Sequence, residues 1–259
     1  MLFEINHLFV DFSLHEKRNS ILSDVSLSVD EGEFVALVGE SGSGKTMTSL
    51  STMHLLPENV NVTGGEILLD GKNLSKMSEK EFRGISGKEI SMIFQEPMTS
   101  LNPLMRVGKQ IEETGRIHGM SKGEASKKAV ELARLTGLTD TKRILRCFPH
   151  ELSGGMKQRI MIASTLMNSP RLLIADEPTT ALDVSTQEEI INILKFLQKT
   201  RKIAMLLVTH DFSVVKKLCT RVYVMFKGKI VEAADTEEIF KNPKHEYTNA
   251  LIQAVIKNR

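Results

Sequence analysis

A continuous apolar run that leads into a glycine-rich turn does most to restrict the fold of this 259-residue chain. Residues 34–38 read FVALV, which is typical of a strand buried on both faces of a parallel sheet. The turn GESGSGKT follows at 39–46, and the segment from Lys45 to Leu56 predicts a helix that ends before Pro57. This region therefore predicts a strand–turn–helix unit of an α/β protein.

The turn fits the phosphate-loop pattern G-x-x-x-x-G-K-[ST] without a mismatch. Glycines allow the backbone to wrap closely, so that its N–H groups point at phosphate oxygens. We expect Lys45 to reach the β- and γ-phosphates of a nucleotide and the Thr46 hydroxyl to hold Mg²⁺. A turn that binds nothing is the alternative, but a lysine at the positive end of a helix dipole argues against it. The predicted phosphate-binding residues are Gly39, Glu40, Ser41, Gly42, Ser43, Gly44, Lys45 and Thr46.

Strand and helix patterns alternate along most of the chain. Residues 1–30 are β-rich, with a polar turn at 15–20, and apolar runs at 172–177 and 203–210 predict buried strands. Helical patterns replace the strand patterns over most of 97–166. We therefore predict a parallel α/β core with a helical subdomain inserted into it.

Composition excludes several classes of protein. Apolar residues make up 41% and charged residues 25%, and the net charge of +2 gives no bulk positive field for nucleic acid. No apolar run approaches the ~20 residues of a membrane span, and the N-terminus lacks the basic lead-in of a signal peptide. Cys147 and Cys219 stand far apart, so we expect two reduced thiols rather than a disulfide framework or a metal site.

Polar residues stand at the ends of three predicted strands, and ligands of open parallel sheets bind beyond the carboxyl ends of the strands. Asp176 and Glu177 end the run RLLIADE. We expect Asp176 to bind Mg²⁺ and Glu177 to act as the general base that takes a proton from attacking water. His210 ends the strand at 203–210 within reach of the γ-phosphate. Gln95 follows SMIF, where it can ligate Mg²⁺ or orient water. A solvated acidic strand end, a surface histidine and a turn glutamine are the structural alternatives.

A second glycine-rich helix start occurs in LSGGMKQRIMIA at 152–163. Ser153 supplies a hydroxyl, and Gly154 and Gly155 supply uncovered N–H groups at the positive end of a helix. This stretch resembles the signature sequence of ATP-binding cassette (ABC) proteins. The motifs of this chain also fall in that family's order: the phosphate loop, Gln95, the signature, the acidic strand end, the ALD at 181–183 and His210.

The resemblance implies a P-loop NTPase of the RecA-like type. Its parallel-sheet core would carry an N-terminal antiparallel β subdomain and an inserted helical subdomain. We expect a single ABC ATPase domain over 1–259, with the β subdomain and core at 1–95 and 166–235, the helical signature subdomain at 96–165 and a C-terminal helical tail at 236–259.

The resemblance also implies a head-to-tail dimer that binds ATP and Mg²⁺ at its seam. Ser153, Gly154 and Gly155 would cap the γ-phosphate held by the loop of the partner, and Asp183 would lie at the seam. Phe12 matches the aromatic residue that stacks on adenine in this family, although a core phenylalanine is an equal interpretation.

The same resemblance implies a transporter. Gln95 would link Mg²⁺ to the helical subdomain, and His210 would sense the γ-phosphate. The expected partners are a second, similar ATPase subunit (an identical one is the alternative), two transmembrane permease subunits and, indirectly, an extracytoplasmic solute-binding protein. No nucleic acid is expected, and the expected location is the cytoplasmic face of the cell membrane.

A narrower resemblance concerns FQEPMTSLNPLMRVG at 94–108, ADEPTTALDVSTQ and NPKHEYTNAL. These stretches resemble importers of oligopeptides, dipeptides and nickel. Many peptide-type members carry a cysteine cluster near a longer C-terminus. The absence of one here argues against an iron–sulfur centre and favours the nickel or metal-chelate type, but the sequence leaves the solute open.

Two other classes of function remain as alternatives. A soluble ABC-type ATPase could act on nucleic acid or ribosomes, but DNA-organising members carry long coiled coils, and this chain has no heptad array. Ribosome-acting members carry two cassettes, and this chain carries one. A nucleotide-binding module without turnover is the third class, and Glu177 argues against it.

Overall fold

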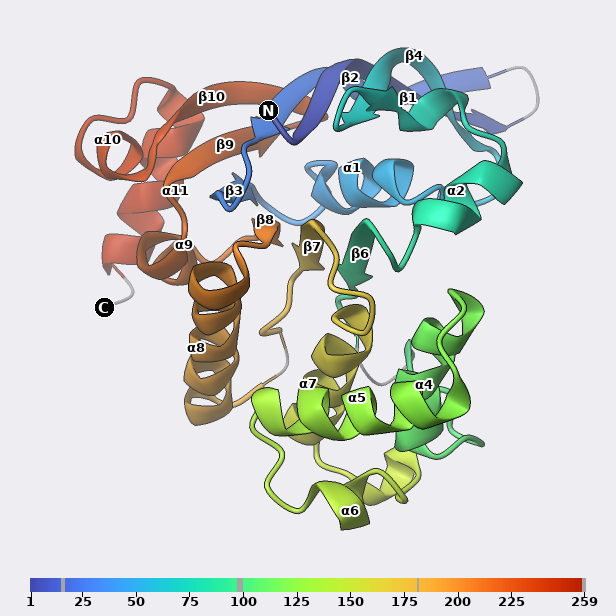
Figure 1. Ribbon diagram of the computed structural model, residues 1–259. Helices are drawn as coiled ribbons and strands as arrows, with labels where there is room; N and C mark the ends of the chain where they lie inside the picture. Colours follow the sequence, from blue (N-terminus) through green and yellow to red (C-terminus); the bar gives the residue numbers. More distant parts are fainter. Residues whose placement is uncertain (15–16, 97–99, 181, 258–259) are drawn as a thin grey trace. The chain divides into compact units, whose positions relative to one another are not determined.

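The computed structural model of the protein describes residues 1–14, 17–96, 100–180 and 182–257. The chain divides into two compact units (Figure 1). Unit 1 comprises Met1–Phe82 and Ala204–Arg259, and unit 2 comprises Arg83–Ile203. Among the described residues, no helix is long and apolar enough to cross a membrane.

An antiparallel sheet forms the N-terminal part of unit 1, which confirms the β subdomain predicted there. Its strand order is β2-β1-β4-β5, with β1 at Phe3–Leu14, β2 at Lys17–Val29, β4 at Val60–Leu69 and β5 at Lys72–Asn73. Phe3 and Ile5 of β1 are fully buried, and so are Leu8 and Val10. The buried positions shift by one residue because the register is irregular between Ile5 and Leu8, where His7 has a φ of 51°.

The polar turn predicted at 15–20 is shorter than expected. Residues 15–16 lie outside the described residues, but Lys17 already belongs to β2. Arg18 and Asn19 pair with Ser13 and Phe12 of β1. Strand pairing with β1 therefore overrides the polar composition of these residues.

The predicted apolar strand is a central strand of the parallel sheet in unit 1. All five residues of β3 (Phe34–Val38) are buried. This strand pairs in parallel with β8 (Ala204–Thr209) on one side and β9 (Arg221–Phe226) on the other. β10 (Lys229–Asp235) adds an antiparallel strand beyond β9. A strand enclosed on both edges and both faces needs a continuous apolar sequence, as FVALV has.

The helix after the phosphate loop is shorter than predicted. α1 runs over Lys45–Thr52 instead of reaching Leu56. His54 has a φ of 56°, a left-handed conformation that stops the helix. Its ring stacks on Phe82 at 4.0 Å, and its Nε2 lies 2.9 Å from the carbonyl oxygen of Leu74. A long-range aromatic contact thus ends the helix before Pro57 does.

The remaining helices of unit 1 lie near the β9–β10 hairpin (Figure 1). They are α9 (Phe212–Leu218), α10 (Thr236–Lys241) and α11 (Glu246–Lys257). The 3₁₀ helix η1 (Leu74–Lys76) follows β5, and α2 (Glu79–Ile85) spans the boundary between the units. α10 and α11 lie on either side of Pro243, within the tail that was expected to be helical.

Unit 2 combines two parallel strands with a group of helices. β6 (Ile90–Ile93) pairs in parallel with β7 (Leu172–Asp176). The helices are α4 (Val107–Ile117), α5 (Lys122–Leu135), α6 (Thr141–Ile144), η2 (Pro149–Glu151), α7 (Gly154–Thr165) and α8 (Val184–Arg201). α4, α5 and α7 pack on one another (Figure 1). The predicted helical insert thus lies within this unit, together with β6, β7 and α8.

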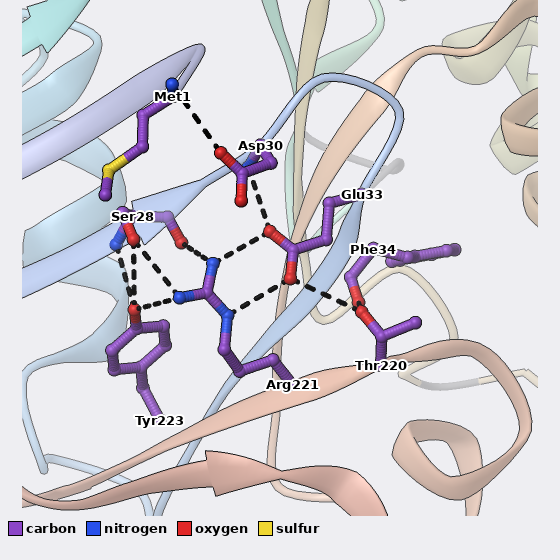
Figure 2. Close-up of polar contacts among 8 residues, drawn as sticks. All are labelled: Met1, Ser28, Asp30, Glu33, Phe34, Thr220, Arg221 and Tyr223. Carbon is purple, nitrogen blue, oxygen red and sulfur yellow. Dashed lines mark hydrogen bonds and ion pairs between the residues drawn. The ribbon is translucent and has the colours of Figure 1, made fainter.

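A polar cluster joins β2 to β9 within unit 1. Figure 2 shows the guanidinium group of Arg221 between Glu33, Ser28 and Tyr223. Its Nε and Nη2 donate to the two carboxylate oxygens of Glu33 at 3.1 and 2.8 Å, and Nη2 also donates to the carbonyl oxygen of Ser28 at 3.0 Å. The hydrogen bonds to Glu33 raise the pKa of Arg221.

Replacing Glu33 with glutamine should lower the free energy of unfolding by about 1–3 kcal/mol, because the neutral amide removes one of two charge-assisted hydrogen bonds to Arg221. Chemical denaturation measures the change. Glu58→Gln, at an exposed position of the same unit, is the matched control and should stay within about 0.5 kcal/mol of the wild type. Equal losses in both variants would show that the cluster adds no stability.

Candidate functional site

The predicted phosphate loop follows the carboxyl end of β3 and leads into α1. Gly44 has a φ of 112°, which glycine adopts far more readily than other residues. Lys45 is buried, and its Nζ donates to the carbonyl oxygens of Gly39 at 2.8 Å and Glu40 at 2.9 Å. The ammonium group therefore lies against the first residues of its own loop, which it holds in a tight curve.

Neighbouring strands pack tightly on two glycines of the loop, and one buried hydroxyl in it suits a ligand. A Cβ at Gly39 would lie 2.2 Å from the carbonyl oxygen of Met225, so only glycine fits there. A Cβ at Gly44 would lie 2.6 Å from Leu22. The Ser43 hydroxyl oxygen is buried and has no hydrogen-bond partner among the described residues. A buried hydroxyl of this kind calls for a ligand or water, and a lysine in a curved backbone suits an anion.

Two contacts from the C-terminal part of unit 1 hold the loop from outside. The N–H of Gly228, in the β9–β10 turn, donates to the carbonyl oxygen of Ser43 at 2.8 Å. The N–H of Glu40 donates to the hydroxyl of Tyr247 in α11 at 2.9 Å. Sequence reasoning missed both roles: no motif marks Gly228, and Tyr247 lies in NPKHEYTNAL, which was given no role at the phosphate loop.

His210 lies next to the loop along the edge of the sheet. Val38, the last residue of β3, is opposite Thr209, the last residue of β8. Gly39 and His210 therefore both follow the carboxyl ends of neighbouring parallel strands, as predicted. His210 is exposed, and the Thr209 hydroxyl before it accepts a hydrogen bond of 3.0 Å from the N–H of Asp211.

Phe12 lies on β1, between Asn19 of β2 and Val60 of β4. It is half-buried and is not among the buried core residues. Two residues away, Val10 pairs with Leu22, the side chain nearest to Gly44 of the phosphate loop. Phe12 is therefore neither a fully buried core residue nor far from the phosphate loop. Its stacking on adenine stays a prediction.

In unit 2, Gln95, Asp176 and Glu177 occupy one edge of the parallel strand pair. Ile93 of β6 is opposite Ala175 of β7, so Gln95 and Glu177 each lie two residues beyond this pair. Gln95 is exposed, whereas Asp176 and Glu177 are buried. The predicted grouping of these side chains at a carboxyl edge is therefore present within the unit.

Glu177 is held in an unusual conformation. Its φ of 47° lies in the left-handed region, which costs free energy for any residue except glycine. Its carboxylate accepts a hydrogen bond of 3.0 Å from the Thr180 hydroxyl, and its carbonyl oxygen accepts one of 3.1 Å from the N–H of Thr180. The turn after β7 thus fixes the direction of this carboxylate.

The signature stretch begins α7 as predicted. Ser153 is its N-cap, and the serine hydroxyl oxygen accepts from the N–H of Met156 at 3.4 Å. The two glycines differ in their surroundings. A Cβ at Gly154 would meet only Leu182 at 3.7 Å, whereas a Cβ at Gly155 would lie 2.5 Å from Thr186. Gly155 therefore permits close packing against α8, and only Gly154 has open space for a side chain.

The next turn of α7 anchors the helix to its surroundings, a role that sequence reasoning missed. Gln158 is buried, and its Nε2 donates to the carbonyl oxygen of Pro178 at 2.7 Å, next to Glu177. Arg159 forms an ion pair with Glu189 of α8 and donates to the carbonyl oxygens of Thr136 and Gly137. Gln158 thus connects the signature helix to the turn that carries Glu177, and Arg159 connects it to α8 and to the end of α5.

Asp183 is the N-cap of α8. Its carboxylate accepts from the hydroxyls of Ser185 and Thr186, each at 2.6 Å, and from the N–H of Thr186 at 3.0 Å. These hydrogen bonds hold the pKa of Asp183 well below its ordinary value. Its place at a dimer seam stays a prediction, and Ala181 of the ALD stretch lies outside the described residues.

The parallel α/β core with its phosphate loop is the fold of a P-loop nucleoside triphosphatase. The family model described as ABC transporter matches residues 22–180, and the model described as Oligopeptide/dipeptide transporter, C-terminal region, matches residues 231–259. The chain belongs to the ABC transporter family.

Named relatives and solved structures agree with this assignment. The chain is 47% identical over 256 residues to the Oligopeptide transport ATP-binding protein OppD of Bacillus subtilis, covering 98% of this chain and 72% of that protein. It is 44% identical over 254 residues to the Dipeptide transport ATP-binding protein DppD of Lactococcus lactis subsp. cremoris, covering 97% of this chain and 73% of that protein. A dimeric structure of the ATP-binding cassette MJ0796 bound to ADP and Pi has a TM-score of 0.81 and 29% identity, and the match covers 90% of this chain and 98% of that one. The predicted family and fold class are confirmed.

Proposed function

We propose that this chain is the ATP-hydrolysing subunit of a peptide importer. The observation that carries the proposal is the phosphate loop, in which Lys45 is buried against the carbonyl oxygens of Gly39 and Glu40. Ser43 beside it has a buried hydroxyl that finds no hydrogen-bond partner in the described part of the chain. Membership of the ABC transporter family supports ATP as the nucleotide. The names of the relatives, which refer to oligopeptide and dipeptide transport, support peptides rather than nickel chelates as the cargo.

The proposed Mg²⁺ ligands are Thr46, Gln95 and Asp176. Thr46 lies in the first turn of α1, and Asp176 is 1% exposed at the end of β7. A hydroxyl, an amide oxygen and a carboxylate are suitable hard ligands for this cation. When bound, Mg²⁺ supplies positive charge that neutralises the phosphate oxygens during hydrolysis.

Glu177 is the proposed general base. The Thr180 hydroxyl and the strained turn hold its carboxylate in one direction, which suits it to accept a proton from attacking water. His210 is proposed to contact the γ-phosphate, and its position one strand from the loop supports this role. Phe12 is proposed to stack on the adenine ring.

The catalytic unit is proposed to be a head-to-tail pair of cassettes. The first N–H groups of a helix have no intrahelical partner. That of Met156 donates to the Ser153 hydroxyl, and Gly154 and Gly155 carry no side chains that could cover the others. Ser153, Gly154 and Gly155 would therefore meet the γ-phosphate on the partner, with Asp183 at the seam. The dimeric state of the MJ0796 cassette bound to ADP and Pi supports a pair of cassettes, and we propose a similar rather than identical partner.

The subunit is proposed to act at the cytoplasmic face of the cell membrane. Two permease subunits would receive its motion through the helical subdomain at 96–165, and a solute-binding protein would deliver the peptide from outside. ATP binding would close the dimer, and hydrolysis would reopen it, which would gate the permease.

Uptake measurements test this proposal. Cells that lack this chain should lose uptake of labelled di- or oligopeptides, and the wild-type chain should restore it while Lys45→Ala should not. The purified chain should also be recovered with its membrane subunits. If cells that lack this chain lose nickel uptake but keep peptide uptake, the cargo is nickel and not peptides. Recovery of the chain with nucleic acid or ribosomes instead of membrane subunits would overturn the proposal.

A further inference from the structure

The C-terminal segment touches the phosphate loop through one side chain. Tyr247 lies in the first turn of α11, and its hydroxyl accepts the hydrogen bond of 2.9 Å from the N–H of Glu40. The carbonyl oxygen of the same Glu40 accepts from Lys45 at 2.9 Å. Tyr247 and Lys45 therefore fix the two peptide groups that flank the second residue of the loop.

Tyr247 is itself held in place by its neighbours. Its ring lies against Phe226 of β9, with ring centroids 4.2 Å apart and an angle of 34° between the ring planes. The N–H of Tyr247 donates to Nδ1 of His245 at 3.1 Å. Burial raises the pKa of Tyr247, which keeps the phenol neutral near physiological pH. The contact with Phe226 thus fixes the ring whose hydroxyl meets the Glu40 N–H.

The turn before α11 is in turn fixed to β10. The carboxylate of Glu232 accepts from the N–H groups of Lys244 at 2.8 Å and His245 at 2.9 Å. Burial opposes ionisation of Glu232, but the combined effect of its hydrogen bonds, which include those from Lys244 and His245, keeps the pKa of this carboxyl below its ordinary value. A continuous series of contacts therefore runs from Glu232 through His245 and Tyr247 to Glu40.

We propose that Tyr247 is a positioning residue for nucleotide binding. By holding the Glu40 peptide, it sets the curve of the loop before the phosphates arrive, so that less conformational freedom is lost on binding. A residue that acts in this way changes the affinity for nucleotide more than the rate of hydrolysis of bound nucleotide. The proposal rests on the proposed function only in taking the loop as the nucleotide site.

Tyr247→Phe tests the proposal because it keeps the ring on Phe226 and removes only the hydroxyl. The Glu40 amide of the full chain should exchange its hydrogen faster than in the wild type. The dissociation constant for ADP, measured by titration calorimetry, should rise about two- to ten-fold, the effect of one neutral hydrogen bond. The kcat of the transporter complex at saturating ATP should stay within about two-fold of the wild type.

The other tyrosine of the chain provides a matched control. The hydroxyl of Tyr223 accepts from the N–H of Ser28 at 3.1 Å and from Arg221 at 3.1 Å (Figure 2), so Tyr223→Phe should leave both the Glu40 amide and the affinity for ADP unchanged. Glu232→Gln, which loosens the turn, should raise the dissociation constant in the same direction as Tyr247→Phe.

Two results would overturn the proposal. One is unchanged exchange of the Glu40 amide in Tyr247→Phe, and the other is faster exchange with an unchanged affinity for ADP. Failure of the wild-type chain to bind ADP would instead contradict the proposed function. The amide-exchange measurement would still test the contact of Tyr247 with Glu40 in that case, so the two failures are distinguishable.

Discussion

Replacing Glu177 with glutamine should nearly abolish ATP turnover while nucleotide still binds. Glutamine has the same size, and its amide oxygen can accept the hydrogen bond that the Thr180 hydroxyl makes to Glu177 at 3.0 Å. The amide cannot take a proton from water, however, and loss of a general base lowers the rate about 10²- to 10⁴-fold. Steady-state release of phosphate measures turnover, and titration with ADP measures binding.

Glu113→Gln is the matched control for this variant. Glu113 is an exposed carboxylate on α4 of the same unit, so its neutralisation should leave the basal hydrolysis rate unchanged. Hydrolysis at the original rate in Glu177→Gln would show that the general base lies elsewhere. Loss of nucleotide binding would show instead that this carboxylate supports the fold of the site.

Replacing Gly154 with leucine should abolish hydrolysis without preventing the subunit from folding or binding ATP. Gly154 is exposed, and a new Cβ there would meet a side-chain atom of Leu182 at 3.7 Å, an ordinary contact, so we expect the subunit to tolerate the change. In the proposed dimer, however, the leucine would fill the space of the γ-phosphate on the partner. We expect the hydrolysis rate to fall by at least about 100-fold. Phosphate release and ATP-dependent dimerisation measured by light scattering check this prediction.

Gly155→Ala distinguishes this steric block from damage to α7. A Cβ at Gly155 would lie 2.5 Å from Thr186, so alanine should lower the free energy of unfolding by about 1–3 kcal/mol. Gly154→Leu should leave the free energy of unfolding close to that of the wild type. Loss of ATP binding by the isolated Gly154→Leu subunit would show that the signature stretch does not act across a dimer.

The elements that could be predicted from sequence are those with a strong local pattern. FVALV marked β3 because a strand enclosed on all sides must be apolar throughout, and the glycines and lysine marked the loop because phosphate binding demands them in order. The end of α1 was not predictable, because it depends on the stack of His54 on Phe82. These two residues are far apart in the sequence, so no local pattern marks their contact. The pairing of β3 with β8 and β9 likewise depends on distant segments.

The candidate site shows the same division. The predicted residues at strand ends were found by their position after apolar runs, and Ser153 by its place before two glycines. Gly155 was assigned to phosphate binding, but Thr186 supplies a packing reason for that glycine. The contacts of Tyr247 and Gly228 with the loop could not be predicted, although NPKHEYTNAL contains Tyr247, because a single hydroxyl or N–H that meets a distant loop leaves no pattern that names its partner.

The contacts around the loop also bear on how the protein is made. Residues 39–46 leave the ribosome long before β8 and β9, which are the strands beside β3. They also precede Gly228 and Tyr247, which form hydrogen bonds with the loop. Contacts between residues so far apart in sequence form late and slow folding. Until they form, β3 presents unpaired edges that can associate with other chains. A nascent chain therefore gains the full set of contacts around the loop only after Tyr247 has been synthesised, and products truncated before β8, which lack both strands beside β3, should not bind ATP.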